Sequence, residues 1–392
     1  MTLRDVQHEL ESLPASLDET YERILTQVPP LHKEKLHKLL RWLIFAARPV
    51  SLEELDEVMA VDHRSQCYDA ASKLMSPEQL FQLGAGLIIK SYKPTKTSAP
   101  FRFMRENNDY SILHVPAAVE AKLSHASVKD FLVSSRILDG PVSSFYMDYT
   151  LSNAFMAETC LIYLLHEPFS QGYCKRLSSL ESLVTKWPLL HYSAFFWTYH
   201  ATALKDKIPN STMKLAFSLF KTKDMARCAN YGLWGSVISP TSPTAVKGTA
   251  PLYYAASFGM VEVVKAILAT EGTADLNKRG GRNKSTPVQV AAYRGREEVI
   301  KVLLKEQPSF EWVEESVGGA LYLGLFNYTS SIPRMLIEGG ATLSTAELKR
   351  LKSARHARRC WEEFGPIVVR DGDKVKGQVV YDVEKGFVMS RG

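Results

Sequence analysis

The chain has 392 residues, of which 45% are hydrophobic and 23% charged, and its net charge is +6 at pH 7. This composition is typical of a folded protein large enough for two or three domains, and the charge is too small to indicate nucleic-acid binding by itself. No apolar run reaches the length of a membrane span, and no apolar signal segment begins the sequence. We therefore expect neither membrane insertion nor secretion.

The five cysteines are scattered, and none belongs to a C-x-x-C pair. This pattern indicates reduced thiols in an intracellular protein rather than a disulfide framework or a zinc site. Signatures of zinc proteases, α/β-hydrolases and protein kinases are absent as well. The protein is therefore predicted not to be an enzyme, with no catalytic residue, no metal and no cofactor.

Residues 1–145 are predicted to form helices, then a pair of strands, then a further helix. Apolar residues at helical spacing and serine capping boxes indicate the helices, and short apolar runs indicate the strands. Helices followed by a two-stranded wing and a helix describe a winged-helix-like domain. The expected elements are helices over 3–13, 16–25, 36–47 and 52–59, strands over 86–90 and 121–125, and a last helix that Ser127 caps.

In a DNA-binding winged helix, a basic recognition helix enters the major groove. The candidate here, Leu52–Met59, is acidic. We therefore expect no direct nucleic-acid binding through it.

Several motifs in this half resemble the segment just downstream of the NACHT domain in fungal NACHT–ankyrin proteins, which are NLR-like signalling ATPases. The motifs are L-P-A-S-L-D-E-T-Y-E-R-I-L (13–25), L-I-F-A-A-R-P-V-S-L-E-E-L (43–55) and H-A-S-V-K-D-F-L (125–132). Two more, at 157–165 and 187–197, extend the resemblance into a helical linking domain, placed at 146–245. Together they cover roughly residues 10–200.

A P-loop, which cradles nucleotide phosphates in such ATPases, is missing. The nearest stretch, 280–286, has no glycine before its lysine and leads into a repeat helix. The chain thus resembles the back half of a NACHT–ankyrin protein without the NTPase domain.

The resemblance allows two interpretations of the role of one residue, His125. His125, with Ser127 and Phe131, matches the family's H-x-S-x-x-[DE]-[FY] motif, in which the histidine contacts the nucleotide phosphate. Because this chain has no P-loop, we favour a relic or a structural histidine bonded to backbone, and keep nucleotide contact as the alternative.

Two segments 36 residues apart repeat one pattern, from Lys247 to Leu268 and from Lys284 to Leu304. Each has a proline that opens a short helix, two alanines, a glycine that ends the helix, and a second apolar helix. A period of this length indicates stacked repeats, and these resemble ankyrin repeats. A third copy at 320–341 has lost its Thr-Pro start, so the repeat domain is placed at 246–345 with two clear copies and one degenerate copy.

In ankyrin folds, the loop tips and inner-helix positions are the variable exposed ones, and aromatic or arginine side chains there make good anchors. The candidates for partner binding are Tyr253, Tyr254, Phe258, Gln289, Tyr293 and Arg294.

Residues 346–392 are predicted to be a basic helix, Ala346–Phe364, and a tail. Six cations lie within eleven residues of the helix, which indicates either a nuclear-localisation signal or a solvated capping helix. The tail alternates apolar positions in two short runs and is expected to be a loose hairpin or disordered. The cations are Lys349, Arg350, Lys352, Arg355, Arg358 and Arg359.

The fold class expected is therefore mainly α, with a winged-helix-like domain that has a small β wing, a helical linking domain and a short ankyrin-repeat solenoid. The favoured function is a non-enzymatic regulatory adaptor that binds a protein partner, one form of which is a transcriptional coregulator. The alternatives are an accessory or inhibitory subunit of a NACHT signalling ATPase, and a truncated relic of one. The location is expected to be nucleus or cytoplasm, with the nucleus favoured.

Overall fold

The fold is that of a computed structural model, which describes residues 16–390 apart from 85, 93–118, 175, 205–206, 222–227, 240–246, 282, 307–318, 326–330, 354–365, 372–373 and 383–385. The chain divides into two compact units, 1–215 and 216–392. Among the described residues, no helix is both long enough and apolar enough to cross a bilayer.

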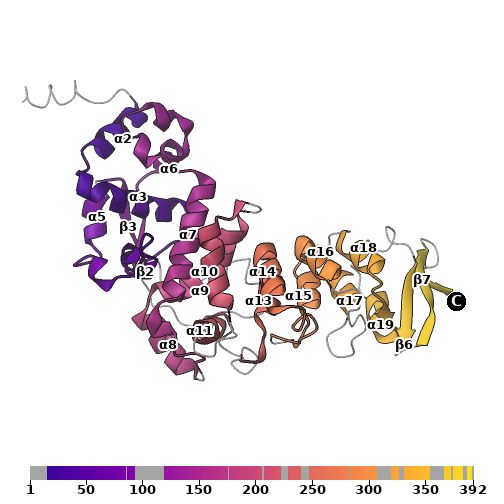
Figure 1. Cartoon of the computed structure of the whole chain (residues 1–392). Coiled ribbons are helices and arrows are strands. Elements are labelled where there is room, and N and C mark those ends of the chain that lie inside the picture. The colour runs from indigo at the N-terminus through magenta and orange to yellow at the C-terminus, as the bar shows by residue number, and fades with distance from the viewer. Residues whose placement is uncertain are drawn as a thin grey trace, which may run out of the picture. The chain divides into compact units, whose positions relative to one another are not determined.

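Unit 1 is helical with two small antiparallel sheets (Figure 1). β1 (Val61–Asp62) pairs with β2 (Cys67–Tyr68), and β3 (Ile88–Tyr92) pairs with β4 (Val119–Leu123). Its helices are α2 (Leu17–Thr26), α3 (Pro30–Phe45), α4 (Leu52–Met59), α5 (Gln79–Leu83), α6 (Ala126–Val133), α7 (Tyr149–Leu164), α8 (Leu177–Lys186), α9 (Leu189–Thr202) and the start of α10 (Asn210–Phe220), with short 3₁₀ turns at Ala70–Ser72, Ser135–Asp139, Ser143–Phe145 and Glu167–Phe169.

The core of unit 1 is the packing of α7 against α9, two helices that are apolar on nearly every face. A chain of polar groups crosses this core. The Tyr192 hydroxyl lies 2.9 Å from Nε2 of His200, and Nδ1 of His200 lies 2.8 Å from Oδ1 of Asn153. The same hydroxyl accepts a hydrogen bond from the backbone N–H of Ala47 after α3. Buried polar groups are costly unless they are paired, so this chain fixes the relative positions of α3, α7 and α9.

The predicted elements of the N-terminal region are largely present. The capping box at Ser51 is confirmed, with the Glu54 N–H donating to Ser51 Oγ and the Ser51 N–H donating to the Glu54 carboxylate. Ser16 caps α2 as expected. The helix predicted over 36–47 begins six residues earlier, at Pro30, because proline is favoured at a first helical position. The strand pair β1–β2 was not predicted, and the helix predicted over 3–13 lies outside the described residues.

Unit 2 stacks helix pairs in two layers (Figure 1). One layer holds α13 (Pro251–Phe258), α15 (Pro287–Tyr293) and α17 (Ala320–Leu325), and the other holds α14 (Val261–Glu271), α16 (Glu297–Glu306) and α18 (Ser331–Glu338). Each helix packs on the next one of its own layer, and the third pair continues the arrangement of the first two. α11 (Cys228–Ile238) precedes them in the same unit.

The predicted glycines stand at the ends of the first helices in two repeats. Gly259 and Gly295 adopt φ of 76° and 69°, in the left-handed region that glycine enters at least cost. The Thr286 side chain caps α15, and Pro287 occupies its first turn. Repeat 1 differs, because Ala250 stands at the cap position and supplies no side-chain bond.

The tail is more ordered than predicted. β6 (Ile367–Asp371) and β7 (Lys374–Asp382) form the expected hairpin, and a third strand, β8 (Gly386–Ser390), pairs with β7. β5 (Leu343–Ser344) adds a parallel partner to β6 and leads into α19 (Thr345–Ser353). Ile367, Val369 and Val379 are fully buried, so the sheet has a core of its own and the alternative of a disordered tail is wrong for these strands.

We expect Gly281→Ala to destabilise unit 2 by about 2 kcal/mol, because φ is +67° at this residue and an added Cβ would collide with the ring and hydroxyl of Tyr253. Gly340→Ala is the matched control. It has a φ of +87° at the end of α18 with open space around it, so its cost should be about 1 kcal/mol. Urea unfolding followed by circular dichroism measures both, and equal losses would contradict the steric account.

We expect His191→Phe to stabilise unit 1 in acid. Burial lowers the pKa of His191 to about 3, and neither ring nitrogen has a hydrogen-bond partner in the described part of the chain. The unfolded chain binds a proton near pH 6.5 whereas the folded chain does not, so stability is lost as the pH falls below 6.5, by about 2 kcal/mol at pH 5.

Urea unfolding at pH 7 and pH 5 measures this slope, which should be smaller in His191→Phe than in the parent chain. His32→Asn, at an exposed histidine, is the control and should keep the parental slope. An unchanged slope in His191→Phe would show that His191 is not the group responsible.

Candidate protein-interaction surface

Gln289 is buried in the capping box that begins α15, in the second repeat. Its Oε1 accepts the Thr286 N–H at 2.8 Å, and its own N–H donates to Thr286 Oγ1. The side chain is fully buried. The expectation that this position is exposed is therefore wrong, because the capping box draws the amide back against the start of α15.

Tyr253 is also enclosed. It is 8% exposed, and its ring lies against Gly280 and Gly281 in the loop that precedes the second repeat. The loop is fastened next to it, since the Gly281 N–H donates to Thr249 Oγ1 at 2.6 Å. Burial raises the pKa of the Tyr253 hydroxyl, and Arg294 and a hydrogen bond to Ser285 partly offset the rise. Tyr253 thus joins the first repeat to the second.

Tyr254 belongs to an aromatic cluster between α11 and α13. Its ring meets the Trp234 ring edge-on at 5.2 Å and the Tyr231 ring at 6.1 Å, and it is 6% exposed. Phe220 completes the cluster against Trp234. The predicted exposure of Tyr254 is corrected as well, because the rings of α11 pack against it, and the equivalent residue of the second repeat, Val290, is buried too.

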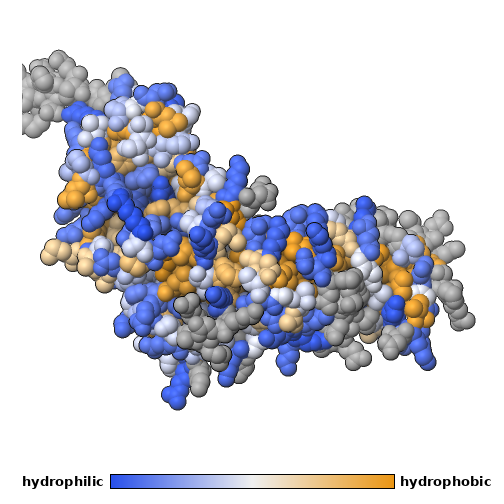
Figure 2. All heavy atoms as spheres, in the orientation of Figure 1, coloured by the Kyte–Doolittle hydropathy of each residue, from blue (hydrophilic) through white to orange (hydrophobic). Residues whose placement is uncertain are grey.

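Three of the six candidates remain accessible. Tyr293 is 43% exposed at the end of α15, and Arg294 beside it is half-buried. Phe258 is the equivalent of Arg294 one repeat earlier. It is half-buried, and its ring centroid lies 5.9 Å from that of Trp234. In Figure 2, hydrophobic residues show between hydrophilic ones along the repeat helices. We call Phe258, Tyr293 and Arg294 the repeat-end surface.

Polar contacts between consecutive repeats hold this surface in place, and sequence reasoning did not find them. Arg296 Nε donates to the Ser257 carbonyl at 3.1 Å, which ties the second repeat to the first. Ser331 Oγ donates to the Glu297 carboxylate at 2.9 Å, which ties the third to the second. Their signal in the sequence is weak because arginine and glutamate at these positions equally fit a solvated helix.

His125 is the N-cap of α6. Its Nδ1 accepts the Ser127 N–H at 3.2 Å and lies 2.6 Å from Ser127 Oγ, which in turn lies 2.7 Å from the Tyr21 hydroxyl. The predicted cap, Ser127, is inside the helix instead. These bonds match the structural reading of His125. Nucleotide contact by its exposed ring stays a prediction.

The acids of α4 do not form a solvated face. Asp56 and Glu57 are buried, and Glu57 accepts a hydrogen bond from the Tyr163 hydroxyl at 2.9 Å and pairs with Lys73. Glu54 pairs with Arg48. α4 is thus a core helix. Its burial is a stronger reason than its charge to expect that it does not enter a DNA groove.

Of the six tail cations, Lys349 and Arg350 are exposed on α19. The backbone of Lys352 continues the helix, and Arg355, Arg358 and Arg359 lie outside the described residues. In the parts of the chain that the structure describes, no three acidic, histidine or cysteine side chains gather as they would to hold a metal ion.

Comparison with known proteins agrees with this geometry. Residues 225–311 match the family model described as ankyrin repeats (3 copies). Ankyrin repeats are therefore present. The match takes in α11, which the sequence placed in the linking domain, and it ends before the degenerate copy at 320–341.

One relative is a fungal protein, the azaphilone pigments biosynthesis cluster protein L of Monascus ruber. It is 27% identical over 312 residues, which is 76% of this chain. The chain spans 60% of the length of that relative.

We expect Gln289→Ala to lower the free energy of unfolding of the repeats by about 1–2 kcal/mol, because the buried Thr286 N–H loses its acceptor. Tyr293→Ser should change it by less than about 0.5 kcal/mol, since that side chain lies at the surface. Urea unfolding compares the two. An unchanged free energy of unfolding in Gln289→Ala would mean that the capping box adds no stability.

Proposed function

We propose that this protein is a non-enzymatic adaptor that holds a protein partner on the repeat-end surface. The proposal rests on the stacked helix pairs of unit 2, where residues match the ankyrin-repeat family model. At the end of one of these helices, Tyr293 is exposed. Tyrosine and arginine are the side chains that most often dominate binding energy at interfaces. Repeat stacks present an extended surface with no enclosed cleft for a reacting substrate.

We further propose a regulatory role, in the form of a transcriptional coregulator that binds a transcription factor without contacting DNA. The likeness to a biosynthesis cluster protein supports a role beside a biosynthetic pathway. The exposed Lys349 and Arg350 support a nuclear location, as the accessible start of the predicted basic signal.

The second candidate is an accessory or inhibitory subunit of a NACHT ATPase. The proposal draws on the family resemblance of 13–25, 43–55 and 125–132. It also draws on the chain order of α2, α3, α4, the β3–β4 pair and α6, which is the order that we predicted for a winged-helix-like domain. His125 at the start of α6 is the residue through which such a subunit would sense nucleotide.

We expect Tyr293→Ala with Arg294→Ala to remove partner capture while the helical circular dichroism signal stays at the parental level. Lys265→Ala with Lys301→Ala is the matched control, since both lysines are exposed in the other helix layer. The measurement is affinity purification of the tagged chain from nuclear and cytoplasmic extracts, followed by mass spectrometry.

A transcription factor that the double variant loses and the control retains supports the coregulator. A NACHT ATPase recovered in its place supports the second candidate. Retention of every partner by the double variant would show that the binding surface lies elsewhere, and ATP hydrolysis by the purified chain would contradict a non-enzymatic role.

A further inference from the structure

His63 lies in unit 1 where the turn after β1 meets α7. Its ring stacks on the Phe155 ring of α7, with centroids 3.9 Å apart and planes 10° from parallel. Nε2 of His63 lies 2.9 Å from Thr159 Oγ1, and Nδ1 lies 3.6 Å from Glu158 Oε2. The side chain is 20% exposed. The ring is therefore held between two neighbouring residues of α7, one of which presents a hydroxyl and the other a carboxylate.

The hydrogen bonds of Thr159 determine which nitrogen of neutral His63 carries the proton. The Thr159 hydroxyl donates its hydrogen to the Phe155 carbonyl at 2.8 Å, so toward His63 it can only accept. Nε2 therefore carries the proton of the neutral ring. Nδ1 is left with a lone pair that faces the Glu158 carboxylate, and two acceptors cannot bond each other. Neutral His63 and Glu158 thus approach each other without a hydrogen bond.

Glu158 also holds the start of α10. Its Oε1 accepts the hydroxyls of Ser211 at 2.5 Å and Thr212 at 2.8 Å. Burial by itself would raise the pKa of Glu158, but hydrogen bonds from protonated His63 and from these two hydroxyls bring the pKa below its ordinary 4.5. Glu158 therefore remains a carboxylate in mildly acidic solution.

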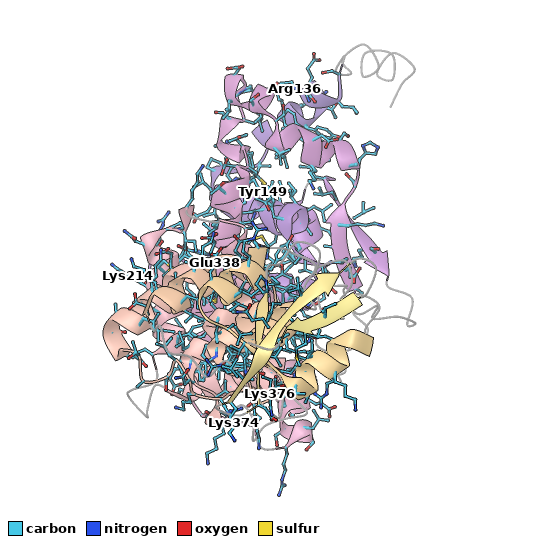
Figure 3. The ribbon with its side chains drawn as sticks, turned by 90° about the vertical axis from the view of Figure 1, so that its right-hand side faces the viewer. Arg136, Tyr149, Lys214, Glu338, Lys374 and Lys376 are labelled. Atoms are coloured by element: carbon cyan, nitrogen blue, oxygen red, sulfur yellow. The ribbon has the colours of Figure 1, made fainter. Side chains whose placement is uncertain are left out.

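The charged groups around His63 act in opposite directions. Burial is the main reason that the pKa of His63 lies below its ordinary 6.5. Glu158 raises this pKa, whereas Lys38 and Arg41, both on α3, lower it further. On α10, Lys214 is exposed and lies at the outer edge of the ribbon (Figure 3). Proton uptake by His63 thus takes place below pH 6.5, and Glu158 is the neighbouring group that favours it.

We propose that His63 is a pH-sensitive contact, which in mild acid takes a proton on Nδ1 and binds the Glu158 carboxylate. The new N–H donates a charge-assisted hydrogen bond to Oε2, the oxygen that faces it. Glu158 keeps its bonds to Ser211 and Thr212, since those use its other oxygen. Acid thereby fastens the turn after β1 to α7 at the residue that holds the start of α10.

The two buried histidines of α9 lack this arrangement. Burial lowers the pKa of both His191 and His200 to about 3, and in the described part of unit 1 no carboxylate raises either value. Both therefore stay neutral in mild acid. His63 differs from them because a carboxylate faces its free nitrogen.

Glu158 should limit the loss of stability that His63 causes in acid. Because the pKa of His63 is lower in the folded chain than in the unfolded chain, the free energy of unfolding falls as the pH drops below 6.5. The pair with Glu158 brings the folded pKa closer to the unfolded value. Removal of the carboxylate should therefore make the folded chain more sensitive to acid.

Proton NMR titration of the histidine rings in the full chain tests the pairing, with His63→Asn used to assign the signal of His63. Glu158→Gln should lower the pKa of His63 by about one unit, because the opposite charge is lost. The glutamine carbonyl can still accept the hydroxyls of Ser211 and Thr212, so the start of α10 keeps its acceptor. Glu262→Gln, at an exposed glutamate of α14, is the control and should leave this pKa at its parental value. An unchanged pKa in Glu158→Gln would overturn the proposal.

Urea unfolding at pH 7 and pH 5 tests the same coupling independently. Glu158→Gln should lose more free energy of unfolding between the two pH values than the parent chain does. In a His63→Asn background, the same substitution should add no pH dependence, because the partner of Glu158 is gone. If Glu158 acts only as an acceptor for α10, Glu158→Gln will change stability equally at both pH values, and the proposal is wrong.

Discussion

The close approach of neighbouring inner helices is the constraint on which the repeat unit depends. A helix of six to eight residues is too short to be stable alone, so α13, α15 and α17 exist because each packs on the next. Small residues allow the approach. A Cβ added to Gly324 would lie 3.8 Å from the Cβ of Ala292, and Ala291 and Ala292 are fully buried.

That constraint determines which residues are left for binding. Polar groups at the helix starts are used for capping, as at Thr286 and Gln289, and aromatic groups of the first repeat are used to close its end. Tyr253 lies against the following loop and Tyr254 against Trp234. The accessible side chains lie at the helix ends, where one repeat passes to the next. A partner bound there would therefore contact a surface to which several repeats contribute.

The stability of unit 1 has a different source. α7 and α9 have 16 and 14 residues and bury most of them, so the hydrophobic effect supplies the stability. The polar chain from Asn153 through His200 to Tyr192 contributes mainly by allowing one arrangement of these helices. Burial lowers the pKa of His200 to about 3, which makes the arrangement sensitive to acid.

Local signals in the sequence determined the features that a single turn of chain contains. The Ser51 capping box, the Thr286–Pro287 start and the left-handed glycines were predicted, because each depends on residues within a few positions of one another. The repeat period was predicted because the same local pattern recurs 36 residues later. The accessible part of the candidate surface, Phe258, Tyr293 and Arg294, followed from the same repeat pattern.

Only the tertiary structure decided which of those residues face solvent. α11 covers Tyr254, the folded loop covers Tyr253, and the core of unit 1 encloses the acids of α4. It also decided that His125 rather than Ser127 caps α6 and that a third strand joins the tail hairpin. Burial depends on groups that are distant in the chain, and spacing within one segment carries no information about it.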